Sequence, residues 1–337
     1  MTATFRVIQY GLGPVGQMVT RDLLARGAFE IVGAVDVDTA KVGRDVATLA
    51  GLDEPIGVVV SPDAGAVLSV EADAVVLTTT SSVVDAERQI APCVAAGKHV
   101  VSTCEELAYP WRTQPDLAHR LNTAAKANHV TVLGTGVNPG FLMDLLPVVV
   151  SGVCRRVDAI RIERIQGAQH RRVPFQRKIG AGLTLERFES RRRDGSLRHV
   201  GLTESMHMIA ARLGWQLDRT EDRVEPVVAD RRIETPGMTV EAGEALGVCQ
   251  TGRGWRDGRE VLTLVFTAAV GQPEPRDRVR IDGEPPMDVI VEGGTHGDVA
   301  TTSITVNAIP VVCRAPAGLR TMADIEPVSC FCGAEAR

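Results

Sequence analysis

The sequence predicts an α/β fold in two parts, a doubly wound parallel sheet followed by a second α+β domain with a mostly antiparallel sheet. In residues 1–140, short apolar runs alternate with helical patterns, which is typical of a parallel sheet covered on both faces. In residues 141–294, strand-like segments alternate apolar and polar side chains, which is typical of an antiparallel sheet. We expect residues 295–337 to return to the first sheet through another helix.

The elements of the first part follow from its apolar runs and its glycines. A strand-like run begins at Phe5, and the helical pattern that follows it ends at Gly27, a residue common after helices. Later apolar runs of strand length are each followed by a helical stretch or a turn. The expected strands are 5–10, 31–36, 73–80, 98–103 and 131–136, with helices at 15–27, 84–96 and 117–130.

The second part shows the period of two in four segments. They are 157–165, 261–269, 278–283 and 287–294. We expect one helix, at about 202–213, to interrupt this sheet. The segment 298–312 has a helical pattern rich in small residues, and it is the part expected to pack on the first domain.

Composition excludes several classes of partner. The net charge of −5 and the lack of a long basic stretch exclude a nucleic-acid or membrane-surface partner. There is no signal segment and no apolar run of about 20 residues, so we expect no membrane span. Seven scattered cysteines suggest reduced thiols in a cytoplasmic protein, and the pair Cys330 and Cys332 lacks the second pair that a metal site needs.

A glycine motif stands between the first predicted strand and the first helix. In "GLGPVG", Gly11 permits a tight turn, Gly13 lets a pyrophosphate approach the backbone, and Gly16 lets the helix lie close to the sheet. Asp36 ends the second strand, where an acid can hold ribose hydroxyls. The residues we expect to contact a dinucleotide are Gly11, Leu12, Gly13, Pro14, Val15, Gly16, Asp36, Asp38, Arg44, Thr79, Thr80 and Asn138.

The charges after the second strand leave the choice of dinucleotide open. Asp36 and Asp38 favour the free 2′-hydroxyl of NAD. Lys41 and Arg44 could hold the 2′-phosphate of NADP, or they could be solvated charges at the start of a helix. We expect the protein to use both NAD and NADP, and no metal.

Two adjacent glutamates, Glu105 and Glu106, follow the strand at 98–103 and so lie at the carboxyl edge of the sheet, where ligands bind in such folds. Ser102 and Glu105, like Thr103 and Glu106, have the spacing of a capping box. A cap needs only one glutamate. The doublet therefore leaves one carboxylate for another task, such as proton transfer.

A second glycine-rich stretch, "GTGVNPGF" at 134–141, opens at the same edge. Asn138 is a candidate helix cap and Pro139 a candidate first helical residue. The crowding of Gly134, Gly136 and Gly140 suggests that something comes close to the backbone. The alternative is that these glycines only form the turn between a strand and a helix.

Five stretches carry a family resemblance: "GLGPVG", "CEELAYP", "GTGVNPGFLMD", "RRVPFQRKIGAGL" and "GGTHGDVATTSITVNAIP". Over nearly the whole chain the sequence resembles the dihydrodipicolinate-reductase-like family that contains 2,4-diaminopentanoate dehydrogenase and the native amine dehydrogenases. The resemblance implies a Rossmann domain, a second domain that closes the cleft, a homodimer, and reversible amination of a ketone or aldehyde with ammonia and NAD(P)H. It also implies that a glutamate faces the substrate amine, with Glu105 as the first assignment and Glu106 as the competing one.

The substrate pocket is less sharply predicted. The motifs suggest an apolar wall, which favours alkyl ketones or aldehydes, although core packing also explains Leu142 and Met143. Arg161, Arg164 and the basic residues at 170–172 could instead bind a substrate carboxylate, or lie on an exposed sheet face or dimer interface. The resemblance implies that Val137, Phe141, Leu142, Gln166, His170 and Leu183 line the pocket. His296 and Thr301 could join them where the chain re-enters the first domain, although a lone histidine in a loop is often structural.

The sequence is compatible with three functions. The preferred one is an NAD(P)-dependent amine dehydrogenase, whose acidic segment suits a cationic iminium. The second is a diamino-acid dehydrogenase of the 2,4-diaminopentanoate type, which shares the mechanism and adds carboxylate recognition. The third is a dinucleotide-sensing protein without catalysis.

Overall fold

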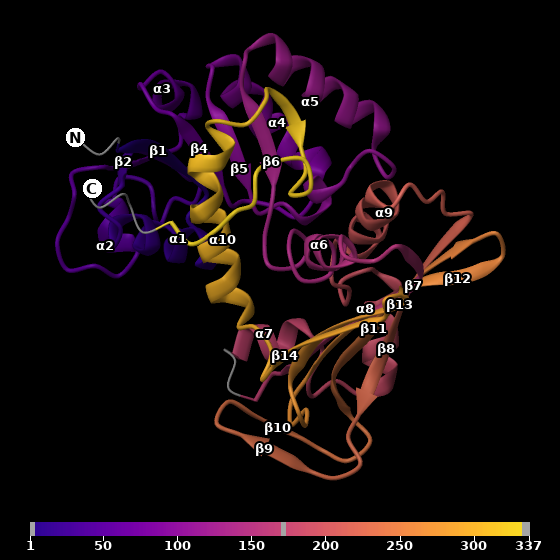
Figure 1. The fold of residues 1–337 in the computed structure, drawn as a ribbon. Helices are drawn as coiled ribbons and strands as arrows, with labels where there is room; N and C mark the ends of the chain where they lie inside the picture. Colours follow the sequence, from indigo (N-terminus) through magenta and orange to yellow (C-terminus); the bar gives the residue numbers. More distant parts are fainter. Residues whose placement is uncertain (1–3, 170–172, 332–337) are drawn as a thin grey trace. The chain divides into compact units, whose positions relative to one another are not determined.

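The computed structural model describes residues 4–169 and 173–331. This part of the chain divides into two compact units. The first contains residues 4–141 and 296–331, and the second contains residues 142–169 and 173–295. Each unit has its own sheet (Figure 1).

The sheet of the first unit has seven strands in the order β15-β6-β5-β4-β1-β2-β3, and every neighbouring pair is parallel. The order reverses at β1, so this is the doubly wound sheet that the sequence predicted. The strands are β1 (Phe5–Tyr10), β2 (Phe29–Val35), β3 (Val60–Ser61), β4 (Ala74–Leu77), β5 (His99–Ser102), β6 (Thr131–Gly134) and β15 (Gly318–Arg320).

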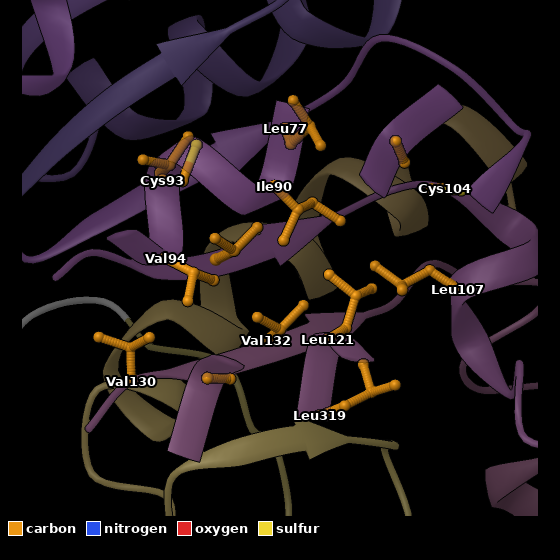
Figure 2. Packing of buried hydrophobic residues seen from close by; sticks show 14 of the residues in the cluster. Leu77, Ile90, Cys93, Val94, Cys104, Leu107, Leu121, Val130, Val132 and Leu319 are labelled. Carbon is orange, nitrogen blue, oxygen red and sulfur yellow. The ribbon is translucent and has the colours of Figure 1, made fainter. Parts of the chain in front are cut away.

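Both faces of this sheet are covered, as the continuous apolar strands require. Val75, Val100 and Val132 belong to a core cluster shared with two helices, α4 and α5, on one face (Figure 2). Their neighbours along the strands, such as Val76 and Val101, are equally buried but lie outside that cluster because successive strand residues point to opposite faces. The helices of this unit are α1 (Pro14–Leu24), α2 (Val46–Leu49), α3 (Ala64–Leu68), α4 (Val83–Ala95), η1 (Glu105–Ala108), α5 (Pro115–Ala127) and α10 (Gly297–Val312).

The helix α10 brings the end of the chain back to the first sheet. It packs against α1 and β5. Arg26, just beyond α1, donates a hydrogen bond of 2.6 Å to the side chain of Asn307 in α10 and another of 2.9 Å to the carbonyl of Phe331. The ring of Phe331 meets those of Phe5 and Phe29 with centroids about 6 Å apart, at 6.1 and 5.8 Å.

The second unit is built on a six-stranded mixed sheet in the order β14-β13-β7-β12-β11-β8. The pair β7–β12 is parallel and the other four pairs are antiparallel. The strands are β7 (Arg156–Gly167), β8 (Arg219–Val228), β11 (Ala245–Arg256), β12 (Arg259–Ala269), β13 (Arg276–Glu284) and β14 (Met287–Glu292), beside a hairpin of β9 (Ile233–Thr235) and β10 (Met238–Val240). The helices are α6 (Leu145–Ser151), α7 (Val173–Lys178), α8 (Leu185–Arg193) and α9 (Leu202–Arg212).

The second unit departs from the sequence prediction in its less apolar elements. The strand β8 is rich in charged side chains because it lies at the sheet edge, and β11 contains glycines, so neither shows a plain apolar alternation. The three consecutive arginines at 191–193 form the last turn of α8. Across the described residues, no helix has both the length and the apolarity to cross a membrane.

Candidate active site

The loops that carry the predicted site leave the carboxyl ends of β1, β2, β4, β5 and β6, which lie at one edge because the strands are parallel. Backbone hydrogen bonds tie each loop to the neighbouring strand. The amide of Gly11 donates to the carbonyl of Val35 at 2.8 Å, and the amide of Thr78 donates to that of Tyr10 at 2.8 Å. The amide of Thr135 donates to the carbonyl of Ser102, also at 2.8 Å.

Two of the glycines in the first loop are required by the protein itself. A Cβ on Gly16 would lie 2.0 Å from the carbonyl oxygen of Gly11, so the helix α1 can approach the turn only without a side chain there. Gly11 has a φ of +92°, and a Cβ on it would lie 2.7 Å from Thr79 Cγ2. These contacts agree with the roles that the motif predicts for the first and third glycines.

Gly13 is different because no protein atom lies within 4 Å of where its Cβ would be. It is the N-cap of α1, with no side-chain cap, and Pro14 fills the first turn, where the missing amide costs nothing. The amino end of this 11-residue helix therefore presents backbone donors and a partial positive charge beside open space. The residues present fit a bound pyrophosphate.

Two polar side chains that the sequence analysis did not single out hold this loop. Gln9 Nε2 and Thr78 Oγ1 each donate to the carbonyl of Gly11, both at 2.8 Å. Gln9 is fully buried, and a polar residue inside an apolar strand directly before the loop was the available signal. Of the predicted threonines, Thr79 donates to the side chain of Gln89, and Thr80 Oγ1 accepts from the amide of Ser82.

The acid at the end of β2 is buried and well connected. Asp36 Oδ2 accepts from the amide of Leu12 at 2.7 Å, and Asp36 Oδ1 accepts from the amide of Asp38 at 2.9 Å. The ammonium of Lys41 lies 3.3 Å from Asp36 Oδ2 and 3.1 Å from Asp38 Oδ2. Arg44 is exposed, and within the described ranges its guanidinium forms no ion pair. The structure thus brings Asp36 and Asp38 together around Lys41 and leaves Arg44 outside.

The two glutamates begin a short 3₁₀ helix, Glu105–Ala108, whose N-cap is Cys104. Both capping-box predictions are wrong. The hydroxyl of Ser102 donates to the carbonyl of Leu77 and accepts from the amide of Cys104, both at 3.1 Å, so it is engaged with the strand end. Burial raises the pKa of the Cys104 thiol to about 12.

Glu106 has a structural partner in another helix. Its Oε2 accepts a hydrogen bond of 2.9 Å from the amide of Val83, the first residue of α4. In addition, the amide of Glu106 donates to the carbonyl of Ser81 at 3.3 Å. The carboxylate therefore satisfies a donor at a helix amino terminus, where negative charge is stabilising. Glu105 is the half-buried neighbour on the same 3₁₀ helix.

The second glycine-rich loop does not start a helix, so the predicted roles of Asn138 and Pro139 as helix cap and first helical residue are wrong. The bond between them is a cis peptide, and the next helix, α6, begins only at Leu145 with Asp144 as its N-cap. Asn138 is buried in this loop. A Cβ on Gly134 would lie 2.6 Å from the backbone of Leu107, so the loop's first glycine makes room for the 3₁₀ helix.

The first unit joins two of the predicted pocket residues. The hydroxyl of Thr301 in α10 accepts from the amide of Val137 at 3.3 Å, and the side chain of Val137 is buried. Phe141 is 36% exposed. His296 is the N-cap of α10, and its Nδ1 accepts from the amide of Val299 at 3.4 Å.

The other predicted pocket residues belong to the second unit. Leu142 is buried, as is Met143 beside it, which agrees with core packing. Gln166 donates to the carbonyl of Thr295 at 3.3 Å, and the backbone of Leu183 pairs with that of Ala245. His170 lies outside the described residues.

Among the arginines considered for carboxylate binding, Arg161 and Arg164 have acidic partners, whereas Arg171 and Arg172 lie outside the described residues. Arg164 is almost fully buried, and its Nη1 lies 3.1 Å from Asp277 Oδ1. Arg161 forms an ion pair of 2.9 Å with Glu163. Breaking a buried ion pair costs considerable stability, so we interpret Arg164 as a structural residue of the second sheet.

Comparison with known proteins finds relatives that span nearly the whole chain. Residues 141–336 match the family model of the 2,4-diaminopentanoate dehydrogenase C-terminal domain. The chain is 33% identical to the 2,4-diaminopentanoate dehydrogenase of Acetoanaerobium sticklandii over 331 residues, which is 95% of this chain and 93% of that protein. It is 26% identical to the amine dehydrogenase of Streptomyces virginiae, covering 94% of this chain and 95% of that protein.

A solved structure shows the same similarity in three dimensions. The amine dehydrogenase of Mycobacterium smegmatis aligns with a TM-score of 0.85 and 26% sequence identity. The alignment covers 97% of this chain and 98% of that one.

Proposed function

This chain belongs to the 2,4-diaminopentanoate dehydrogenase family, and we propose that it is an amine dehydrogenase that reversibly converts a ketone or aldehyde and ammonia to an amine. It is an oxidoreductase of the class that acts on amines. The observation that carries the proposal is the acidic 3₁₀ helix Glu105–Ala108, which leaves the same sheet edge as the glycine loop.

A nicotinamide dinucleotide is the proposed cofactor. The open space at Gly13, the amino end of α1 and the acid Asp36 are the parts of this chain that would hold its pyrophosphate and ribose. When bound in its reduced form, the dinucleotide supplies the hydride. The protein's own residues bind it, orient it and manage the protons of the reaction.

We assign the proton transfers to Glu105. Its carboxylate takes a proton from ammonium, which frees the nitrogen lone pair to attack the carbonyl carbon. The same proton then goes to the hydroxyl of the carbinolamine, which leaves as water. The regenerated carboxylate stabilises the iminium cation that results. Hydride addition to the iminium carbon gives the neutral amine, so one ammonium and one hydride are consumed for each water released.

Glu106 is assigned a positioning role instead. Its carboxylate accepts from the amide of Val83, so turning it toward a substrate would leave that donor at the start of α4 without this acceptor. The two glutamates are therefore adjacent in sequence but are assigned different roles. Glu106 orients the 3₁₀ helix that carries Glu105.

A diamino-acid substrate is the second candidate, and the 33% identity to a 2,4-diaminopentanoate dehydrogenase favours it. Such a substrate carries a carboxylate that needs a cation. Arg161 and Arg164 are each paired with an acid of the same sheet, so neither is proposed as that cation, and Arg171 and Arg172 lie outside the described residues.

The test follows NAD(P)H absorbance with ammonium and a panel of alkyl ketones, aldehydes and amino-keto acids, with each carbonyl also assayed without ammonium. We expect consumption that requires ammonium and an amine product detected by mass spectrometry. Consumption without ammonium would replace amination by carbonyl reduction. Preference for an amino-keto acid would select the second candidate, and dinucleotide binding without any turnover would favour a sensor.

The homodimer and the cytoplasmic location expected from the sequence stay predictions. Light scattering coupled to gel filtration measures the first. A mass near twice 36.0 kDa is the expected result.

A further inference from the structure

The ammonium of Lys41 occupies an unusual position, between two carboxylates beside the proposed ribose site. It lies 3.3 Å from Asp36 Oδ2 and 3.1 Å from Asp38 Oδ2, and only 22% of its side chain is exposed. Burial acts to lower the pKa of Lys41, but its hydrogen bonds to Asp38 and Asp36 outweigh this and raise the pKa above its ordinary value. Lys41 is therefore a fixed positive charge.

The turn that carries Lys41 is held in place by its backbone. The amides of Lys41 and Val42 both donate to the carbonyl of Asp38, at 2.9 and 3.0 Å. The amide of Gly43 donates to the carbonyl of Val60 in β3, and the carbonyl of Arg44 accepts from the amide of Val60. The backbone of this turn is thus set by the fold, and it places Lys41 next to Asp36.

Asp36 keeps the capacity to bind a ribose hydroxyl. Its carboxylate accepts three hydrogen bonds, from the amides of Leu12 and Asp38 and from Lys41. A carboxylate offers about four acceptor positions, so one remains. A 2′-hydroxyl can use that position, whereas a 2′-phosphate brings negative charge toward the carboxylate and is repelled.

We propose that Lys41 is the specificity-determining residue by which this site admits both NAD and NADP. Its ammonium offsets the charge of Asp36 that would exclude a 2′-phosphate, and it leaves Asp36 free to accept from a 2′-hydroxyl. Without Lys41 the ribose site would present two uncompensated carboxylates. This inference rests on the proposed dinucleotide site, and it concerns recognition of the adenosine end alone.

Binding of nucleotide fragments tests the proposal without catalysis. The probes are 5′-AMP and adenosine 2′,5′-bisphosphate, which differ only in the 2′-phosphate, with dissociation constants measured by isothermal titration calorimetry. We expect the wild-type protein to bind both. In Lys41→Met, binding of the bisphosphate should weaken at least tenfold, while that of 5′-AMP changes less than twofold.

Arg44→Met is the matched control, because it removes a positive charge from the same turn but touches neither acid. We expect it to weaken bisphosphate binding less than threefold. A larger loss in Arg44→Met than in Lys41→Met would assign the phosphate to Arg44 and overturn the proposal. So would equal losses of both probes in Lys41→Met, or a wild-type protein that binds 5′-AMP but not the bisphosphate.

A mutant-cycle comparison separates charge compensation from direct phosphate binding. In a background with both Asp36→Asn and Asp38→Asn there is no carboxylate for Lys41 to offset, so adding Lys41→Met should change the ratio of the two dissociation constants less than threefold. A tenfold change in that background would show that Lys41 binds the phosphate directly and would contradict the proposed compensation. Thermal midpoints confirm that each variant is folded.

These results are independent of the proposed activity. If ammonium-dependent turnover is absent but Lys41→Met still weakens the bisphosphate alone, the function is wrong and the selectivity inference stands. If turnover is present and the two probes respond equally to Lys41→Met, the selectivity inference fails by itself.

Discussion

The two glycine-rich loops at the carboxyl edge of the first sheet look alike in sequence but differ in what their glycines accommodate. In the loop at 11–16, Gly11 and Gly16 are required by the protein's own packing, whereas a Cβ on Gly13 would meet open space. In the loop at 134–140, a Cβ on any of the three glycines would come close to protein backbone. It would lie 2.6 Å from Leu107 for Gly134, 3.1 Å from Pro139 for Gly136, and 2.5 Å from Gly136 for Gly140.

The difference shows that a glycine-rich loop at a ligand-binding edge has two explanations, which only the structure separates. The first loop keeps one position clear for a ligand. The second is closed upon itself and upon the 3₁₀ helix of Glu105 and Glu106, so its role is to hold the acidic segment in place. We therefore propose that the first loop binds the dinucleotide and that the second supports the segment with Glu105.

The largest effect is expected for Gly134→Ala. The added Cβ would meet backbone atoms of Leu107 and Ala108, which cannot rotate away, so the 3₁₀ helix must move. We expect a loss of stability of about 1–3 kcal/mol, as for overpacked cores, together with a loss of turnover. Gly27→Ala is the matched control, because nothing lies within 4 Å of its Cβ position. Equal thermal midpoints for the two variants would contradict the close packing.

Gly13→Ala should separate binding from folding in the first loop. Its Cβ meets no protein atom but occupies the space kept for the pyrophosphate. We expect weakening of NADPH binding by at least about tenfold, or 1.4 kcal/mol. Stability should fall by less than about 1 kcal/mol, because alanine is a poorer N-cap than glycine. Unchanged NADPH affinity by fluorescence titration would show that the ligand does not use this space.

Substitution of Glu106, which supports the 3₁₀ helix, should cause a smaller loss of stability. Glu106→Ala removes the acceptor of the Val83 amide, and we expect a loss of about 1 kcal/mol, as for other helix caps. Glu106→Gln keeps an acceptor oxygen and loses only the charge, so its cost should be about 0.3–1 kcal/mol. Urea unfolding measures both. An alanine variant as stable as the wild-type protein would mean that the contact does not hold α4.

The smallest effect is expected for chemical labelling of Cys104, the residue directly before Glu105. Burial raises its pKa to about 12, so the thiol stays protonated at every pH well below that value. Because the thiolate is the reactive form, iodoacetamide at pH 8 should leave Cys104 unlabelled in the folded protein, whereas the exposed Cys330 reacts. Peptide mass mapping reads both sites. Labelling of Cys104 at the rate of Cys330 would show that this segment opens readily.

The sequence predicted the first unit well because its strands are continuous apolar runs between helices. The strand at 5–10 was predicted with the bounds that the structure has, and the confirmed parallel sheet follows from the same pattern. The pattern failed for two strands whose residue types do not alternate between apolar and polar. These are the charged edge strand β8 and the glycine-containing strand β11.

The site shows what local sequence cannot supply. The doublet Glu105–Glu106 and the first glycine motif were visible as spacings. The partner of Glu106 is Val83, on a helix that precedes it in the chain and meets it only in the folded sheet. The spacings at Ser102 and Asn138 suggested caps that the structure does not form, because Ser102 bonds the neighbouring strand and no helix begins directly after Asn138.

The most direct test of the account compares Glu105→Gln with Glu106→Gln in the ammonium-dependent NAD(P)H assay. The account predicts that Glu105→Gln keeps the wild-type thermal midpoint and affinity for 5′-AMP but loses turnover by about 10²- to 10⁴-fold, the size of general acid–base catalysis. Glu106→Gln should retain turnover within about tenfold, because it acts only by positioning. Turnover of Glu105→Gln within twofold of the wild-type rate would contradict the account.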